Sequence, residues 1–144
     1  MTQYILDTDH ITLLQHSNPL ILQRFETLDT SDVAITVINV EELIQGWFNA
    51  IRQASQPGQK QRLSWAYVGL RSAVKFINDF PVLDFTESAY EQYLALRRQG
   101  IRIGTQDLRI ASIALVNNSI LVTRNRQDFA QVPGLVLEDW TYSS

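Results

Sequence analysis

Four acidic side chains that lie far apart in the sequence could together hold a metal ion: Asp7, Glu42, Asp107 and Asp128. If they share one partly dry pocket, their negative charges repel one another, and a divalent cation removes that conflict. Carboxylate oxygens in a chain without cysteine favour Mg²⁺ or Mn²⁺ over zinc. The chemistry available to such a site is phosphodiester hydrolysis, in which the cation polarises the phosphoryl group and activates a water molecule.

The earlier acids also have ordinary structural explanations. Asp7 ends the apolar run "YIL" and is either a turn residue or a site residue, because burial of an unpaired carboxylate is costly. Asp9 can cap the helix that follows it or hold a metal-bound water from just outside the ligand shell. Of the neighbouring Glu41 and Glu42, one is a solvated first-turn acid, and helical phase does not decide which.

The later acids leave the same alternatives open. Asp107 heads an apolar helix face that continues at Ile110, so it is either a buried cap or a metal ligand. Asp128 lies in a predicted loop, where a lone acid would be solvated. We expect His10 and His16 on helix surfaces, so the expected ligand set contains only oxygen atoms.

The elements that must position these acids alternate between strand and helix. Apolar runs predict strands over 3–6, 33–38, 81–85, 119–123 and 135–139, amphipathic periodicity predicts helices over 9–17, 19–28, 40–54, 60–80, 87–99 and 106–118, and 124–134 is expected to be a loop. This alternation is typical of an α/β fold with a parallel sheet, whose ligand site lies beyond the carboxyl ends of the strands. Asp7 and Asp128 fall at that edge. Asp107 reaches it only if residues 100–104 carry its helix back over the strand ends.

Polar residues and one glycine mark the expected helix ends. Asp9, Asn39 and Thr105 can each cap the start of a helix, and Gly100 can end the helix over 87–99. These caps place Glu42 and Asp107 in first helical turns.

The composition fits a single globular domain over residues 1–144. The net charge of −3 argues against generic nucleic-acid binding, although six arginines and only one acid lie between Arg97 and Arg126. The absence of cysteine excludes disulfide frameworks and thiolate catalysis. We find no secretory signal and no apolar run long enough to cross a membrane, and we expect a cytoplasmic protein.

Five stretches, in this order, resemble the PIN-domain family, and specifically its VapC-type toxin ribonucleases. They are "YILDTD" (4–9), "ITVINVEELIQG" (35–46), "IGTQDLRIASIAL" (103–115), "LVTRNRQDF" (121–129) and "VPGLVLEDW" (132–140). The resemblance implies a three-layer α/β/α sandwich with a central parallel sheet. It also implies Mg²⁺- or Mn²⁺-dependent endonucleolytic cleavage of RNA, a cognate antitoxin protein as partner, and a homodimer.

The resemblance assigns roles to individual residues of this chain. The family's acids fall on Asp7, Glu42, Asp107 and Asp128, of which Asp7 and Asp107 would bind the metal directly. Supporting polar positions fall on Asp9, Thr123 and Asn125, and Arg109, Arg124 and Arg126 would contact RNA phosphates or pair with the acids.

An aromatic segment departs from the resemblance. Residues 49–76 form an inserted helical pair, and most of the aromatic residues within or beside it are expected in the core: Trp47, Phe48, Trp65 and Tyr67. An exposed subset would instead suit the dimer or antitoxin surface.

Two other functions compete with the nuclease. In a phosphatase of the haloacid dehalogenase type, Asp7 would be the nucleophile and Asp9 the general acid. That chemistry needs a lysine near the late acids, and the chain has only Lys60 and Lys75, both in the middle helices. The other competitor is a non-catalytic RNA-binding or interaction module in which the acids serve as caps.

Overall fold

A central sheet of five parallel strands organises the chain. The computed structural model describes residues 2–142, so residues 1, 143 and 144 of the expected domain lie outside the described part. The strands are β1 (Tyr4–Leu6), β2 (Val33–Thr36), β3 (Val82–Leu83), β4 (Ile120–Val122) and β5 (Leu137–Glu138). They are paired in the order β3-β2-β1-β4-β5, and each pair is parallel. The predicted parallel α/β architecture is therefore confirmed.

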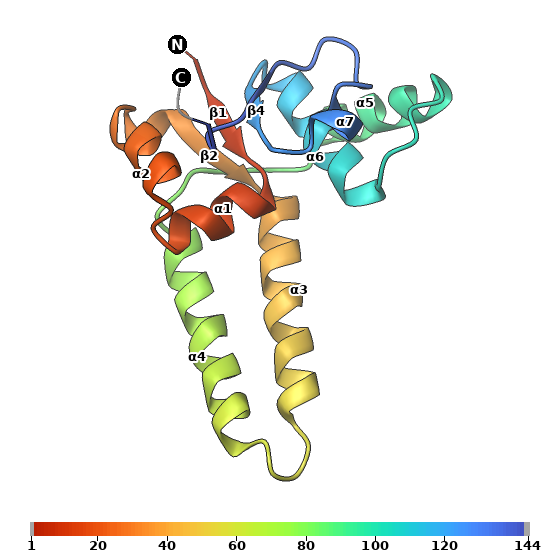
Figure 1. Cartoon of the computed structure of the whole chain (residues 1–144). Helices are drawn as coiled ribbons and strands as arrows, with labels where there is room; N and C mark the ends of the chain where they lie inside the picture. Colours follow the sequence, from red (N-terminus) through yellow and green to blue (C-terminus); the bar gives the residue numbers. More distant parts are fainter. Residues whose placement is uncertain (1, 143–144) are drawn as a thin grey trace.

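Helices cover both faces of this sheet (Figure 1). They are α1 (Thr8–Gln15), α2 (Pro19–Glu26), α3 (Val37–Ala54), α4 (Lys60–Ile77), α5 (Glu87–Arg98), α6 (Thr105–Val116) and α7 (Arg126–Phe129), with a short 3₁₀ turn, η1 (Thr30–Asp32). Among residues 2–142, none of these helices combines the length and the apolar character needed to span a bilayer.

Two hydrophobic clusters, one on each face, bury the sheet. Tyr4 and Leu6 of β1 pack with residues of α1, α2 and α4, among them Ile11, Ile21 and Ile77. Ile5 packs into the other cluster, with residues of α5, α6 and α7 such as Leu96, Leu108 and Phe129. Because successive side chains of a strand point to opposite faces, this division places the helices in two layers around the sheet. The α/β/α sandwich follows directly.

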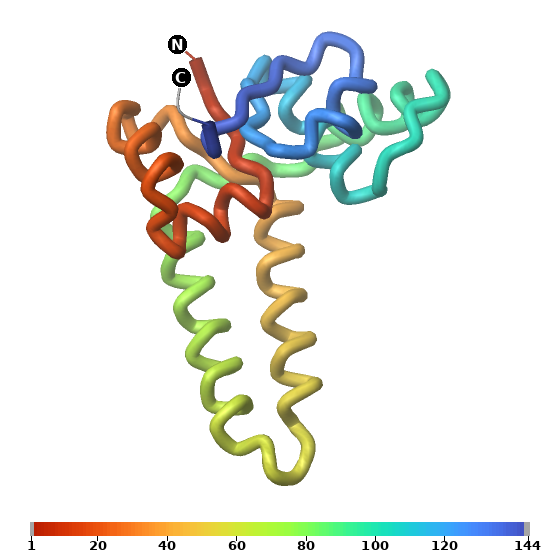
Figure 2. Tube along the Cα trace, viewed as in Figure 1, coloured from red at the N-terminus to blue at the C-terminus, as the bar shows by residue number. Residues whose placement is uncertain are grey.

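Helices α3 and α4 form a long hairpin that projects away from the sheet (Figures 1 and 2). Each contains 18 residues, which corresponds to about 27 Å of helix. The expectation that its aromatic residues lie mostly in the core is wrong: Phe48, Trp65 and Tyr67 are 49%, 59% and 55% exposed. Trp47 is half-buried and packs edge-on against Trp65, with ring centroids 5.2 Å apart. An isolated hairpin of two helices has one shared face, so side chains on its other faces stay uncovered.

Several helix starts differ from the predicted ones. Asp7, not Asp9, caps α1, because its side chain accepts a hydrogen bond from the backbone N–H of His10. Strand β2 ends at Thr36, and α3 begins directly after it. Thr36 and Asn39 form a capping box in which each side chain accepts from the other's backbone N–H. The predicted cap Asn39 is therefore the third residue of the helix.

Two elements in the second half of the chain also differ from the predicted ones. Helix α6 includes Thr105, and Gly104 is its N-cap without a side-chain hydrogen bond. The predicted loop over 124–134 contains the one-turn helix α7, capped by Asn125. The predicted stop at Gly100 is confirmed, since this residue has a φ of 85° and follows Gln99, the C-cap of α5.

Candidate active site

Asp7 is fixed in place by a buried histidine. Its Oδ1 accepts hydrogen bonds from the backbone N–H of His10 at 2.8 Å and contacts the His10 ring nitrogen Nδ1 at 3.0 Å. The His10 side chain is fully buried, and the Asp7 side chain is 13% exposed. Both interactions use Oδ1, which leaves Oδ2 of Asp7 for a cation.

The surroundings of His10 determine its tautomer. Its Nε2 accepts a hydrogen bond from the backbone N–H of Trp140 at 3.3 Å, so the ring proton of the neutral form sits on Nδ1 and is donated to Asp7. Asp139 lies 3.6 Å from the same Nε2. The expectation that His10 is a surface residue is therefore wrong. It lies inside the core because the segment after β5 folds over α1.

Glu42 is held by a chain of hydrogen bonds through Thr8 and Asn39. The Thr8 hydroxyl donates to Glu42 Oε1 at 2.7 Å and accepts from the Asn39 side-chain amide at 3.0 Å. Asn39 is buried and is itself tied to Thr36 through the capping box. This chain of hydrogen bonds therefore runs from Thr36 at the end of β2 to the carboxylate of Glu42, beside Asp7.

Asp107 reaches the same edge of the sheet from the first turn of α6. Burial is the largest cause of its raised pKa, followed by the negative charges of Glu42, Asp128 and Asp7. The four carboxylates come from four segments, and Glu42, Asp128 and Asp7 are close enough to Asp107 for their charges to raise its pKa. The segment over 100–104 brings α6 back over the strand ends, as the convergence of Asp107 requires.

Asp128 is oriented by Asn125 across the single turn of α7. The Asn125 side-chain amide donates to Asp128 Oδ2 at 3.0 Å, and the Asp128 backbone N–H donates to Asn125 Oδ1 at 3.3 Å. Asn125 in turn donates its backbone N–H to the hydroxyl of buried Thr123 at 3.0 Å. The two polar residues after β4 thus support the fourth acid from outside the acidic cluster.

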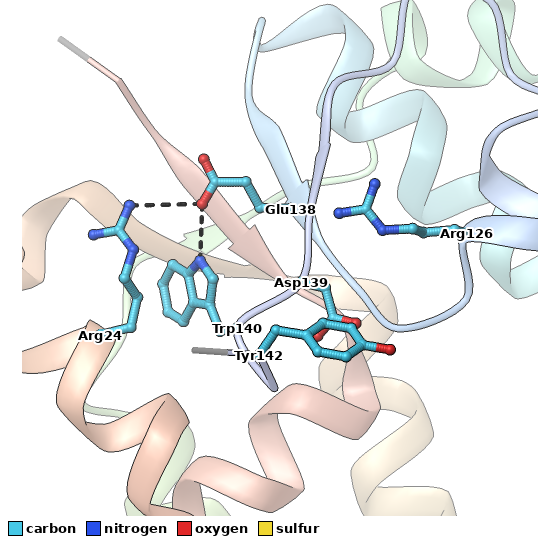
Figure 3. A pocket seen from close by; sticks show the side chains of 6 residues that line it. All are labelled: Arg24, Arg126, Glu138, Asp139, Trp140 and Tyr142. Carbon is cyan, nitrogen blue, oxygen red and sulfur yellow. Dashed lines mark hydrogen bonds and ion pairs between the residues drawn. The ribbon is translucent and has the colours of Figure 1, made fainter. Parts of the chain in front are cut away.

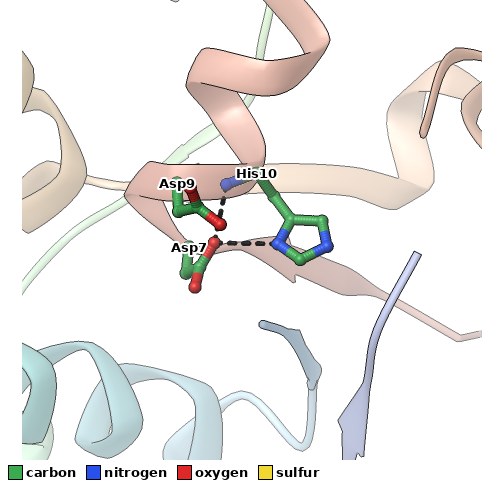
Figure 4. Close-up of side chains that lie close together, drawn as sticks. All are labelled: Asp7, Asp9 and His10. Atoms are coloured by element: carbon green, nitrogen blue, oxygen red, sulfur yellow. Dashed lines mark hydrogen bonds and ion pairs between the residues drawn. The ribbon is translucent and has the colours of Figure 1, made fainter. Parts of the chain in front are cut away.

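Asp7, Asp9 and His10 each place one ligand atom within 4.8 Å of the other two, and this cluster could hold a metal ion (Figure 4). Two of its members have competing partners. Both oxygens of Asp9 accept from Arg124, from Nε at 2.7 Å and from Nη2 at 2.8 Å, and both His10 nitrogens are hydrogen-bonded as described. Asp7 is therefore the member with a free oxygen atom.

The three arginines expected at RNA phosphates lie in different surroundings. Arg124 forms the bidentate ion pair with Asp9, which was the alternative role for it. Arg109 donates to Gln106 Oε1 at 2.8 Å and lies over the Tyr93 ring at 5.9 Å. Arg126 lines a separate cavity with residues of the C-terminal segment. Their contacts with RNA stay predictions.

Sequence reasoning missed the residues that hold the acids, namely Thr8 and His10, and misplaced Asn39. The middle residue of "DTD" was a signal for Thr8, because a hydroxyl between two site acids has polar groups within reach. No local signal pointed to His10, whose partner Trp140 is 130 residues away.

Comparison with known proteins adds an independent observation. The PIN domain family model matches residues 4–135. Ribonuclease VapC1 of Haemophilus influenzae is 31% identical over 140 residues, which cover 96% of this chain and 98% of that protein. The tRNA(fMet)-specific endonuclease VapC of Salmonella typhimurium is 30% identical over 144 residues, with 97% and 99% covered.

Solved structures give the same picture. The structure of VapBC-1 from nontypeable Haemophilus influenzae superposes with a TM-score of 0.76 at 30% identity, covering 98% of this chain and 100% of that chain. From the family match across most of the chain, together with the sheet order and the acids at its carboxyl edge, it follows that this chain belongs to the PIN domain family.

Proposed function

We propose that this protein is a Mg²⁺- or Mn²⁺-dependent endoribonuclease and the toxin of a toxin–antitoxin pair. The observation that carries the proposal is the convergence of four carboxylates from separate segments: Glu42, Asp128 and Asp7 lie near enough to Asp107 for their charges, after its burial, to raise its pKa. A cluster that is strained by its own negative charge is suited to a divalent cation, and its oxygen-only donors favour a hard one.

We assign different roles in metal binding and positioning to the side chains of this site. Asp7 through its free Oδ2, together with Asp107, would bind the cation, while Glu42 and Asp128 would accept hydrogen bonds from water molecules around it. When bound, the cation neutralises charge on the phosphodiester and makes a nearby water more acidic. Thr8 and Asn125 keep Glu42 and Asp128 oriented at 2.7 and 3.0 Å before the substrate arrives.

The relatives support RNA as the substrate and a protein as the regulator. Proteins related over nearly their whole length are named ribonuclease VapC1 and tRNA(fMet)-specific endonuclease VapC. Similar solved structures include VapBC assemblies, among them one of Salmonella typhimurium bound to DNA. We extend both properties to this chain as parts of the proposal. The predicted homodimer stays a prediction, which light scattering of the purified protein would test.

A groove beside the acids suits an antitoxin segment. It has a volume of about 370 Å³ and runs from α1 along the α3–α4 hairpin. Its lining combines one acid and two threonines with mainly apolar residues: Thr8, Thr12, Glu42, Leu43, Gly46, Trp47, Ala50 and Trp65. A peptide in this groove would block the acidic cluster from one side.

The test compares Asp7→Asn with a matched control, Asp84→Asn, in an exposed loop. We expect the wild type and Asp84→Asn to cleave RNA only when Mg²⁺ or Mn²⁺ is present, and Asp7→Asn to lose at least about 100-fold in rate. Calorimetric titration with Mn²⁺ should show binding that Asp7→Asn weakens. If Asp7→Asn cleaves RNA as fast as the wild type in saturating metal, the nuclease proposal is wrong.

The same experiment decides between the nuclease and its rivals. A non-catalytic RNA-binding module would bind RNA without metal-dependent cleavage in any variant. The phosphatase needs Asp9 as a free general acid, and the bidentate ion pair with Arg124 argues against that role. Hydrolysis of a phosphomonoester such as p-nitrophenyl phosphate, abolished by Asp9→Asn, would favour the phosphatase instead.

A further inference from the structure

A cavity of about 340 Å³ lies outside the acidic cluster, between α2, α7 and the segment after β5 (Figure 3). It is lined by Arg24, Arg126, Glu138, Asp139, Trp140 and Tyr142. Its volume is at the lower end of the ~300–1,000 Å³ typical of small-ligand pockets. The acidic-cluster chemistry described above uses none of these side chains directly.

The two acids that line this cavity, Glu138 and Asp139, already interact with other groups of the chain. Glu138 Oε1 accepts from the Trp140 indole N–H at 3.0 Å and lies 3.6 Å from the Arg24 guanidinium. Asp139 Oδ1 accepts from the backbone N–H of Thr141 at 2.8 Å and from the hydroxyl of the same residue. Their negative charge is therefore partly compensated within the C-terminal segment and by Arg24.

Arg126 brings a positive charge without a partner. Among residues 2–142 it has no salt bridge within 4.0 Å and no side-chain hydrogen bond, and it is exposed. Figure 3 shows its guanidinium pointing from α7 toward the strand that carries Glu138. An unpaired guanidinium beside a cavity is a natural binding group for a phosphate oxygen.

Tyr142 supplies an aromatic face in the same cavity. Its side chain is 76% exposed, whereas Trp140 is 2% exposed and packs against Tyr4 in the core. An exposed aromatic ring next to a free guanidinium is the combination with which proteins bind single-stranded nucleic acid: the base stacks and the phosphate pairs with the cation.

The cavity adjoins the acidic cluster by two short connections. Asp139 in its wall lies 3.6 Å from His10, which contacts Asp7. Arg126 and Asp128 belong to the same single turn of α7, so one turn presents a positive charge to the cavity and a negative charge to the cluster. The cavity therefore lies beside the acidic cluster, where a neighbouring part of a bound RNA strand could reach it.

We infer that this cavity is a nucleotide-binding subsite, which holds one nucleotide of the RNA beside the cleaved phosphodiester. Arg126 binds its phosphate and Tyr142 stacks on its base. The inference rests on the proposed ribonuclease function for the identity of the polymer, and it adds the residues that would favour one position of the RNA over others.

The test measures RNA binding separately from cleavage. A fluorescein-labelled single-stranded RNA of about eight nucleotides is titrated with Asp107→Asn protein in Mg²⁺, a background in which cleavage is expected to be slow. In that background Arg126→Gln and Tyr142→Ala should each raise the Kd about tenfold. Arg126→Gln should also lower the slope of log Kd against log salt by about 0.7.

Matched controls and a modified RNA sharpen the result. Arg71→Gln and Tyr67→Ala replace an exposed arginine and an exposed tyrosine on α4 and should leave the Kd unchanged. An RNA series with one abasic nucleotide at each position in turn should lose affinity at one position, and Tyr142→Ala should remove that loss. Tyr142→Phe should bind as the parent does.

The outcomes separate the subsite from the nuclease. If Arg126→Gln and Tyr142→Ala bind RNA as the parent does, or weaken only the binding of an antitoxin, the subsite is refuted while cleavage by the wild type can stand. If the parent binds no RNA, the subsite is refuted as well. If the wild type never cleaves RNA but both variants weaken RNA binding, the cavity stands as a nucleotide-binding site, while its place beside a cleaved phosphodiester and the nuclease are both refuted.

Discussion

The acidic edge of the sheet and the α3–α4 hairpin are held in shape in opposite ways. At the edge, each of three acids has a polar neighbour that fixes it, such as His10 for Asp7, and these neighbours are tied to the core. The hairpin depends on contact between its two helices and leaves large apolar side chains uncovered, with Trp65 59% exposed. The comparison indicates that hydrogen bonds fix the acids of the edge before any ligand binds, while the hairpin exposes apolar surface that the single chain does not bury.

Of the changes considered at the acidic edge, Asp107→Asn should have the largest effect on RNA cleavage. Removal of one carboxylate from the cluster takes away a proposed metal ligand, so we expect RNA cleavage to fall at least about 100-fold. The same change removes a buried, repelled charge, so the metal-free protein should become more stable at pH 7, with Tm higher by about 2–4 °C. Cleavage assays and thermal unfolding in EDTA measure the two effects.

The pH dependence of stability gives a second measure of the same cluster. The pKa of Asp107 is raised in the folded protein above the ordinary 3.8, so folded molecules keep a proton that unfolded chains have released. The free energy of unfolding should therefore fall as pH rises from about 3.8 through the raised pKa, and Asp107→Asn should reduce that fall. An Asp107→Asn protein that is less stable than the wild type at pH 7 without metal would contradict the repulsion.

The replacement His10→Leu tests whether the edge depends on its buried support. It removes the proton donated to Asp7 and leaves the backbone N–H of Trp140 without its acceptor. We expect the Kd for Mn²⁺ to rise about 10–100-fold, because an unsupported ligand must be ordered on binding. Calorimetry with Mn²⁺ measures the change, and circular dichroism checks that the variant is folded.

The matched control for this change is His16→Leu, at the exposed end of α1. It should leave the Kd for Mn²⁺ as in the wild type. His10→Gln serves if the leucine variant does not fold. Wild-type affinity for Mn²⁺ in a folded His10 variant would show that the acidic edge does not need the histidine.

Sequence reasoning was accurate for the edge where the sheet itself enforces the geometry. The carboxyl ends of parallel strands must meet on one side, so Asp7 and Asp128 could be placed together from strand positions alone. Asp107 was harder, because its position depends on how residues 100–104 turn. The family resemblance supplied that turn, not the hydrophobic pattern.

Reasoning from local sequence was wrong where the partner is distant or absent. His10 sits at a helical position that looks exposed until Trp140 covers it. Conversely, the amphipathic pattern over 60–80 marks an apolar face without telling whether anything covers it, and Trp65 and Tyr67 turned out to be exposed. Burial is a property of the assembled chain, so these errors have the same physical origin.

The pair Gly69→Ala and Gly46→Ala tests how the hairpin is held together. A Cβ at Gly69 would lie 2.1 Å from the Trp47 ring, so alanine there must displace that ring or push the helices apart, at a cost of about 1–3 kcal/mol. A Cβ at Gly46 meets nothing within 4 Å, and alanine should stabilise α3 by about 0.4–1 kcal/mol. Urea unfolding compares them. The Kd for Mn²⁺ should stay unchanged in Gly69→Ala, and a loss of metal binding would mean that hairpin and edge are coupled.

The smallest effect is expected for Val68→Ser on the outer side of the hairpin. Val68 is 60% exposed, so its replacement removes little buried apolar area, and the free energy of unfolding should change by less than about 0.5 kcal/mol. RNA cleavage should be unchanged as well, because the residue lies on α4, away from the acids. The informative control is Ala66→Ser, at a fully buried neighbour on the same helix, which should cost more because a hydroxyl is buried. If Val68→Ser destabilises the purified protein as much as Ala66→Ser does, and the loss grows with protein concentration, then a second copy of the chain covers this face in solution. If the two differ as expected, the face that carries Val68 contributes little to the stability of the single chain and is available to a partner.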